Sequence, residues 1–143
     1  MEKNFYRPVY DITADAGVEV WGKTPEELIC NLVRATVNEM VELSKVEPKE
    51  ELTLEVESVG FPYLLADVVN EILYIFDVKK FVPSTCEVVR LKEDGTFAVL
   101  KLKGERYNPQ KHGKKLLIKA ATYHGLKMEE KDGKFTARVI FDI

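Results

Sequence analysis

Alternating and helical hydrophobic patterns succeed one another along the 143-residue chain. In short extended segments apolar and polar residues alternate, which is typical of strands with one buried face. In two longer segments apolar residues recur every three or four positions, which is typical of amphipathic helices. The strands are predicted at residues 6–10, 18–21, 52–57, 85–91, 97–102, 116–123, 126–130 and 135–141.

The first helix is predicted to begin after Thr24 and to continue to about residue 43. Thr24 suits the N-cap position, and Pro25 suits the first helical position because proline needs no hydrogen-bond acceptor there. Glu27 completes a capping box with Thr24.

The second helix is predicted at 63–76, and its apolar residues cover more than half of its circumference. We therefore expect the second helix to be the more buried one.

Two Asp-Gly pairs between alternating runs predict tight β-hairpins, at Asp94-Gly95 and at Asp132-Gly133. Strands and helices do not alternate regularly, so a doubly wound parallel sheet is not expected. We predict a single α+β domain over residues 1–143, in which two helices pack on a largely antiparallel β-sheet.

The composition fits a globular domain, because 45% of the residues are hydrophobic and 31% are charged. The sequence contains no apolar run of transmembrane length, and its first residues lack the apolar core of a signal peptide. We therefore expect a cytoplasmic protein that does not contact membranes. Cys30 and Cys86 have no cysteine or histidine at zinc spacing, and we interpret them as small buried apolar residues and not as a disulfide.

The net charge of −3 argues against a nucleic-acid footprint over the whole protein. Residues 101–119 depart from this balance, because only Glu105 opposes their basic side chains. Those basic residues are Lys101, Lys103, Arg106, Lys111, Lys114, Lys115 and Lys119. They could form a local surface for a negatively charged partner, or simply a solvated face.

Acidic residues occur near both ends of the chain. Asp11, Thr13 and Asp15 alternate near the start, and Asp142 lies beside the α-carboxylate of Ile143 at the end. If the fold brings these groups together, their mutual repulsion requires a cation or a basic side chain. Oxygen ligands alone favour calcium, magnesium or manganese over zinc. The alternatives are an ordinary turn at the first position and an exposed strand end at the second.

Lys119 lies in an otherwise apolar segment, where a lysine either faces solvent or pairs with a carboxylate. His112 and His124 do not have zinc spacing with each other or with either cysteine. No Ser/His/Asp arrangement is evident in the sequence. These residues alone therefore do not predict a catalytic centre.

Several segments, taken together and in order, resemble the archease family. The matching segments are residues 11–17, 20–24, 26–28, 70–77, 104–105, 111–112, 118–124 and 139–143. One residue departs from the family pattern, since Ile12 stands where the family usually has histidine. If that histidine contributes to metal or ligase contact, Ile12 removes the contribution.

The resemblance implies an archease-like fold and a protein cofactor that is not itself an enzyme. Archeases assist the GTP-dependent RNA-splicing ligase that joins tRNA exon halves. They promote guanylylation of the ligase's active-site histidine and allow multiple turnover, so tRNA would be a partner only indirectly. Carried over, the family's calcium ligands are Asp15, Asp142 and the terminal residue Ile143, although another hard divalent cation could take that place. Lys119 carries over as a candidate for ligase activation.

Two other classes of function use the same residues differently. A metal-dependent hydrolase would use the carboxylates itself, but the sequence lacks an obvious general base or nucleophile. A chaperone or RNA-binding adaptor would use the basic stretch at 101–119, but the acidic net charge weakens that interpretation.

Overall fold

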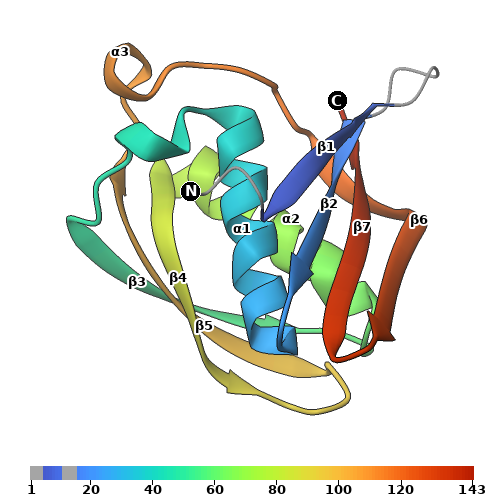
Figure 1. Cartoon of the computed structure of the whole chain (residues 1–143). Coiled ribbons are helices and arrows are strands. Elements are labelled where there is room, and N and C mark those ends of the chain that lie inside the picture. The colour runs from blue at the N-terminus through green and yellow to red at the C-terminus, as the bar shows by residue number, and fades with distance from the viewer. Residues whose placement is uncertain (1–4, 11–15) are drawn as a thin grey trace.

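Helix α1 (Pro25–Met40) lies between two antiparallel sheets in the computed structural model, which describes residues 5–10 and 16–143 (Figure 1). The first sheet has the order β1-β2-β7-β6, and the second has the order β3-β5-β4. The strands are β1 (Tyr6–Tyr10), β2 (Ala16–Gly22), β3 (Glu50–Glu57), β4 (Phe81–Leu91), β5 (Phe97–Arg106), β6 (Ala120–Lys131) and β7 (Lys134–Asp142). The other helices are α2 (Tyr63–Lys79), the short α3 (Pro109–His112) and the 3-10 turn η2 (Leu43–Lys45). The predicted α+β class with antiparallel strands is confirmed.

The two helices and both sheets share one hydrophobic core. Val18 and Val20 enter it from β2, and Leu100 and Leu102 enter it from β5; all four side chains are inaccessible to solvent. Because α1 contacts both β2 and β4, its apolar side chains connect the two sheets. In the described part of the chain, no helix is long and apolar enough to cross a membrane.

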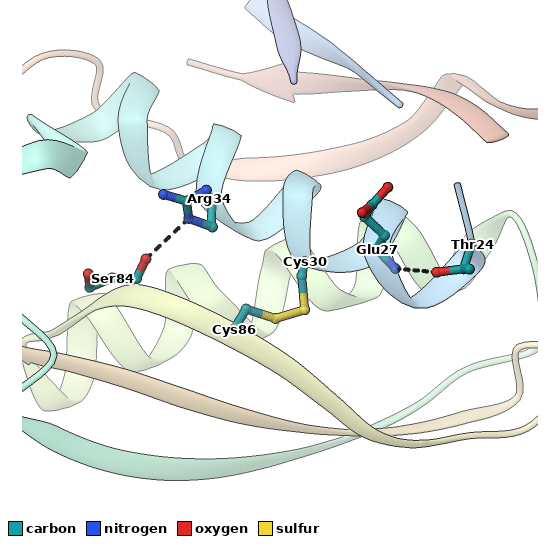
Figure 2. Close-up of a disulfide and its surroundings, with 6 residues drawn as sticks. All are labelled: Thr24, Glu27, Cys30, Arg34, Ser84 and Cys86. Atoms are coloured by element: carbon teal, nitrogen blue, oxygen red, sulfur yellow. Dashed lines mark hydrogen bonds between the residues drawn. A yellow bond between two sulfur atoms is a disulfide. The ribbon is translucent and has the colours of Figure 1, made fainter. Parts of the chain in front are cut away.

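The start of α1 follows the predicted cap. The hydroxyl of Thr24 accepts a hydrogen bond from the backbone N–H of Glu27 at 3.0 Å (Figure 2). The Glu27 carboxylate in turn accepts one from the N–H of Lys23 at 2.6 Å. These bonds satisfy backbone donors that have no partner within the helix. The helix ends at Met40, earlier than expected, because the backbone at Val41 is extended.

The expectation that the second helix is the more buried one is wrong. Eight side chains are buried in α1 and eight in the slightly longer α2. Because α1 lies between two sheets, it is covered on two sides. Helix α2 packs mainly against β6 and α1, and Tyr74 and Val78 on it are more than half exposed.

Both predicted hairpins are present, between β4 and β5 and between β6 and β7. At the second one, Asp132 and Gly133 both have positive φ, as a two-residue turn of this hand requires. The predicted strand at 116–123 is wrong in its first half, because β6 begins at Ala120 and continues to Lys131. The backbone N–H groups of Lys115 and Leu116 instead donate to carbonyls at the C-terminal end of α1.

The interpretation of Cys30 and Cys86 as buried thiols is also wrong. The two residues form a disulfide that connects α1 to β4, with Cα atoms 5.2 Å apart (Figure 2). Both are only partly buried. They lie 56 residues apart in sequence, so the pairing depends on how α1 packs on the sheet.

Candidate functional site

The C-terminal strand ends in exposed carboxylates. Ala137, Val139 and Phe141 point into the core, as the predicted alternation requires. Asp142 and Ile143 follow them and are exposed, with 43% of the Ile143 surface accessible. Among the described residues, the Asp142 side chain has no ion-pair partner. Within the described residues, Asp142 and Ile143 therefore fit the alternative of an exposed strand end.

Three segments meet at this end of the first sheet. Phe141 pairs with Ala16 at the start of β2, and Asp142 pairs with Ala120 at the start of β6. The backbone N–H of Lys119 donates to the carbonyl of Asp142 at 2.8 Å. The C-terminus therefore lies beside the end of β1 and the start of β2 (Figure 1).

The third predicted metal ligand lies outside the described residues. Asp15 belongs to residues 11–15, with Asp11 and Thr13, and the structure describes none of them. Within 5–10 and 16–143, no group of three or more His, Cys, Asp or Glu side chains could hold a metal ion. The convergence of the two acidic ends stays a prediction.

Lys119 lies immediately before β6 and not inside a strand. Its side chain is exposed and forms no ion pair with any described residue, as the solvent-facing alternative predicts. The same side chain lines a cavity of about 680 Å³ between α2 and residues 107–119. Lys119 thus joins two features, because its backbone holds the end of β7 and its side chain lines this cavity.

The Glu39 carboxylate, near the same end of the sheet, already has two tyrosine hydroxyls as hydrogen-bond partners. The hydroxyl of Tyr6 donates to Glu39 at 2.6 Å, and the hydroxyl of Tyr10 lies 3.4 Å from the other oxygen of Glu39. Burial raises the pKa of Tyr6, and the hydrogen bond to Glu39 raises it further. Both phenols therefore stay protonated and keep the Glu39 carboxylate as their acceptor.

Hydrogen-bond donors that the sequence did not predict surround the carboxylate of Glu105. The Glu105 side chain is only 9% exposed, and its neighbour His112 is fully buried. His112 Nε2 lies 2.9 Å from Glu105, while Nδ1 accepts a hydrogen bond from the N–H of Asn108. Nε2 must therefore carry the proton and donate to Glu105. Lys111 adds an ion pair at 2.8 Å.

The surroundings of Glu105 keep it ionised. Burial by itself would raise the pKa of this carboxyl group. The hydrogen bonds from Lys111, from the backbone N–H of Glu47 and from His112 outweigh burial and lower the pKa of Glu105 to about 2. One signal could have indicated this role, because Glu105 is the lone acid in a basic stretch.

The basic stretch does not form one continuous charged face. Lys111 pairs with Glu47 and Glu105, and Lys115 pairs with Glu42. Lys101 and Lys103 lie on β5, in the middle of the second sheet. Only part of the stretch lines the cavity, through Lys114 and Lys119. The interpretation as a solvated, partly ion-paired face fits most of these residues.

The fold defines a class of protein: an α+β domain built of two antiparallel sheets around a central helix, in which Asp142 and Ile143 are exposed after the core-facing part of β7. The sequence model of the Archease protein family (MTH1598/TM1083) matches residues 8–143. The chain belongs to this family.

Similar proteins agree with this assignment. The chain is 35% identical to "Protein archease" of Methanopyrus kandleri, over 92% of this chain and 94% of that protein. It is also 35% identical to "Protein archease" of Pyrococcus furiosus, over 94% and 96% of the two chains. The solution structure of Methanobacterium thermoautotrophicum protein 1598 matches with a TM-score of 0.78 and 30% identity, covering all of both chains.

A further solved structure supports the fold alone. It is the crystal structure of an archease from Thermotoga maritima, described as a possible chaperone, with a TM-score of 0.64 and 24% identity over 96% of each chain. The predicted resemblance to archeases is therefore confirmed.

Proposed function

We propose that this protein activates a GTP-dependent RNA ligase that joins tRNA exon halves. It would act as a protein cofactor and not as an enzyme, promoting guanylylation of the ligase's active-site histidine and multiple turnover. Membership of the archease family supports this proposal. The observation that carries it is the pair of exposed carboxylates at Asp142 and Ile143, since a group that acts on another protein must be accessible.

The cation at this end would be calcium or another hard divalent ion. Asp142 and the terminal carboxylate of Ile143 offer only oxygen donors, which such ions prefer. Asp15 would be the third ligand. It precedes Ala16 in the chain, and Ala16 pairs with Phe141, the residue before Asp142. This register between described residues supports the choice of Asp15 as the third ligand.

Each residue would have a distinct role. The three carboxylates would hold the cation and leave part of its coordination open to the ligase or its nucleotide. The bound cation would supply positive charge near a triphosphate. Lys119 is exposed and its backbone N–H bonds to the carbonyl of Asp142, so its side chain would balance the carboxylates or meet phosphate.

Replacing Asp142 tests this proposal. Asp142→Asn keeps the shape of the side chain and removes its charge, so calcium binding and stimulation of ligase guanylylation should be lost. The measurement is transfer of labelled guanylate to the ligase, with and without calcium, alongside calcium titration calorimetry. The unfolding free energy should change by less than about 0.5 kcal/mol, because the side chain is exposed.

Glu130→Gln is the matched control, because Glu130 is an exposed acid on β6 of the same sheet. It should bind calcium and stimulate the ligase as the wild-type protein does. Full stimulation by Asp142→Asn would refute the proposed role of the C-terminal carboxylates.

A further inference from the structure

A groove with a volume of about 680 Å³ lies between α2 and residues 107–119. Its inner surface is mostly apolar. The less exposed apolar lining residues are Met40, Leu73, Phe76, Tyr107, Leu116 and Ile118. They are buried or half-buried, so the groove continues outward from the hydrophobic core.

Several contacts hold the groove in its open shape. The Tyr107 ring lies 4.9 Å from the Phe76 ring and 5.9 Å from the His112 ring, between centroids. The Tyr107 hydroxyl donates to the carbonyl of Gly113 at 2.8 Å, and its backbone N–H donates to Lys80 at 2.7 Å. His112 is in turn held by the buried Glu105. A wall supported in this way needs little ordering when a ligand binds.

The rim of the groove is predominantly positive. Lys80, Lys114 and Lys119 line it, and Asp77 is the one acidic lining residue. All four side chains are exposed, and within the described ranges none of the three lysines forms an ion pair. The groove therefore suits a ligand that combines negative charge with an apolar group.

Two further apolar side chains that line the groove are largely exposed. Tyr74 on α2 is 56% exposed, and Leu117 on the opposite side is 69% exposed. A small anion bound by the lysines would leave much of this apolar lining in water. A polypeptide segment would cover them together with the groove, as large apolar residues at the centre of protein interfaces are covered.

We propose that this groove docks an acidic segment of a partner protein, with at least one large apolar side chain inserted between α2 and residues 107–119. The inference rests on the proposed function, because the partner that carries the segment is then the RNA ligase. The groove and the chain terminus are linked through Lys119, whose side chain lines the groove and whose N–H bonds to Asp142. Docking here would hold the C-terminal carboxylates at the ligase surface.

The test is titration calorimetry with the purified ligase and a double variant of the full chain, Lys114→Glu with Leu117→Ser. Both residues are exposed and lie outside helices and strands, so the fold should persist. The variant should bind the ligase at least about tenfold more weakly. Added salt should weaken binding of the wild-type protein more than binding of the variant, because the lost contact is partly ionic.

Val59→Ser with Lys131→Glu is the matched control, because it makes the same kinds of change at exposed positions outside the groove. Its affinity should equal that of the wild-type protein. Tyr74→Ser changes the α2 side of the groove independently and should also weaken binding of the ligase. Circular dichroism checks that the helix content of this variant is unchanged. In the wild-type complex, hydrogen exchange should slow at residues 73–80 and 114–119.

The two possible failures are distinguishable. If the wild-type protein binds the ligase and both groove variants bind equally well, the groove proposal is wrong and the ligase remains the partner. If the wild-type protein does not bind the ligase at all, the proposed function fails, and this occupant of the groove fails with it.

Discussion

Glu105 in the second sheet and Asp142 in the first sheet have opposite surroundings. In the second sheet, β5 carries Glu105, which is buried and receives hydrogen bonds from Lys111, His112 and the backbone of Glu47. In the first sheet, β7 ends at Asp142, which is exposed and pairs with no described basic side chain. A carboxylate whose hydrogen-bonding capacity is used within the fold stabilises it. A carboxylate left open is available for a cation or a partner.

The disulfide adds to this difference, because it attaches α1 to the second sheet only. Replacing Cys30 and Cys86 by serine should lower the unfolding free energy by about 4 kcal/mol, since the bond closes a loop of more than fifty residues in the unfolded chain. Urea denaturation under oxidising conditions measures the loss. A reducing agent should bring the wild-type protein close to the variant.

The reduced protein should still bind calcium, because the disulfide lies on β4 and the proposed site lies at the end of β7. If reduction of the disulfide also abolished calcium binding, the proposed independence of the two sheets would be contradicted. If the reducing agent left the unfolding free energy of the wild-type protein unchanged, the stabilising role of the disulfide would be contradicted.

Glu105→Gln should have the next largest effect, a loss of about 2 to 3 kcal/mol, because Lys111 and His112 then lose a charged acceptor. Acid sensitivity should change with it. The folded-state pKa of Glu105 is about 2, below its ordinary value of 4.5. The stability from the charged form is therefore complete above about pH 4.5 and is lost as the pH falls towards about 2.

Urea denaturation at several pH values checks this, and the variant should lose less stability than the wild-type protein over that interval. Glu55→Gln, at an exposed position of β3 in the same sheet, is the control and should change stability by less than about 0.5 kcal/mol. Identical acid profiles for the wild-type protein and Glu105→Gln would show that Glu105 is not the titrating group.

The smallest effect on stability is expected from extending the chain beyond Ile143, which is exposed. A short C-terminal tag moves the terminal carboxylate away from Asp142, so calcium binding and ligase activation should both weaken. Calorimetry with calcium measures the first, and the same tag at the N-terminus is the control. Unchanged calcium affinity in the C-terminally tagged protein would leave Asp142 in the site and remove Ile143 from it.

Much of the local structure follows from nearby residues. The Thr24 cap, the Asp-Gly hairpins and the inward face of β7 were all predictable, because each depends on neighbours within a few positions. The predicted strand at 116–123 was half wrong for a related reason. Leu116 and Ile118 join the hydrophobic core without strand pairing before Ala120, and a hydrophobic pattern does not distinguish this environment from a strand.

The candidate site divides in the same manner. The sequence by itself determined that acidic groups stand near both chain ends and that β7 points its apolar residues inward as far as Phe141, since alternation is a local property of a strand. Only the tertiary structure decided that Cys30 meets Cys86, that Glu105 is buried with His112, and that Lys119 lies between the groove and Asp142. Each of these pairings joins segments whose separation in space is set by packing of the core, and residue spacing along the chain does not encode that distance.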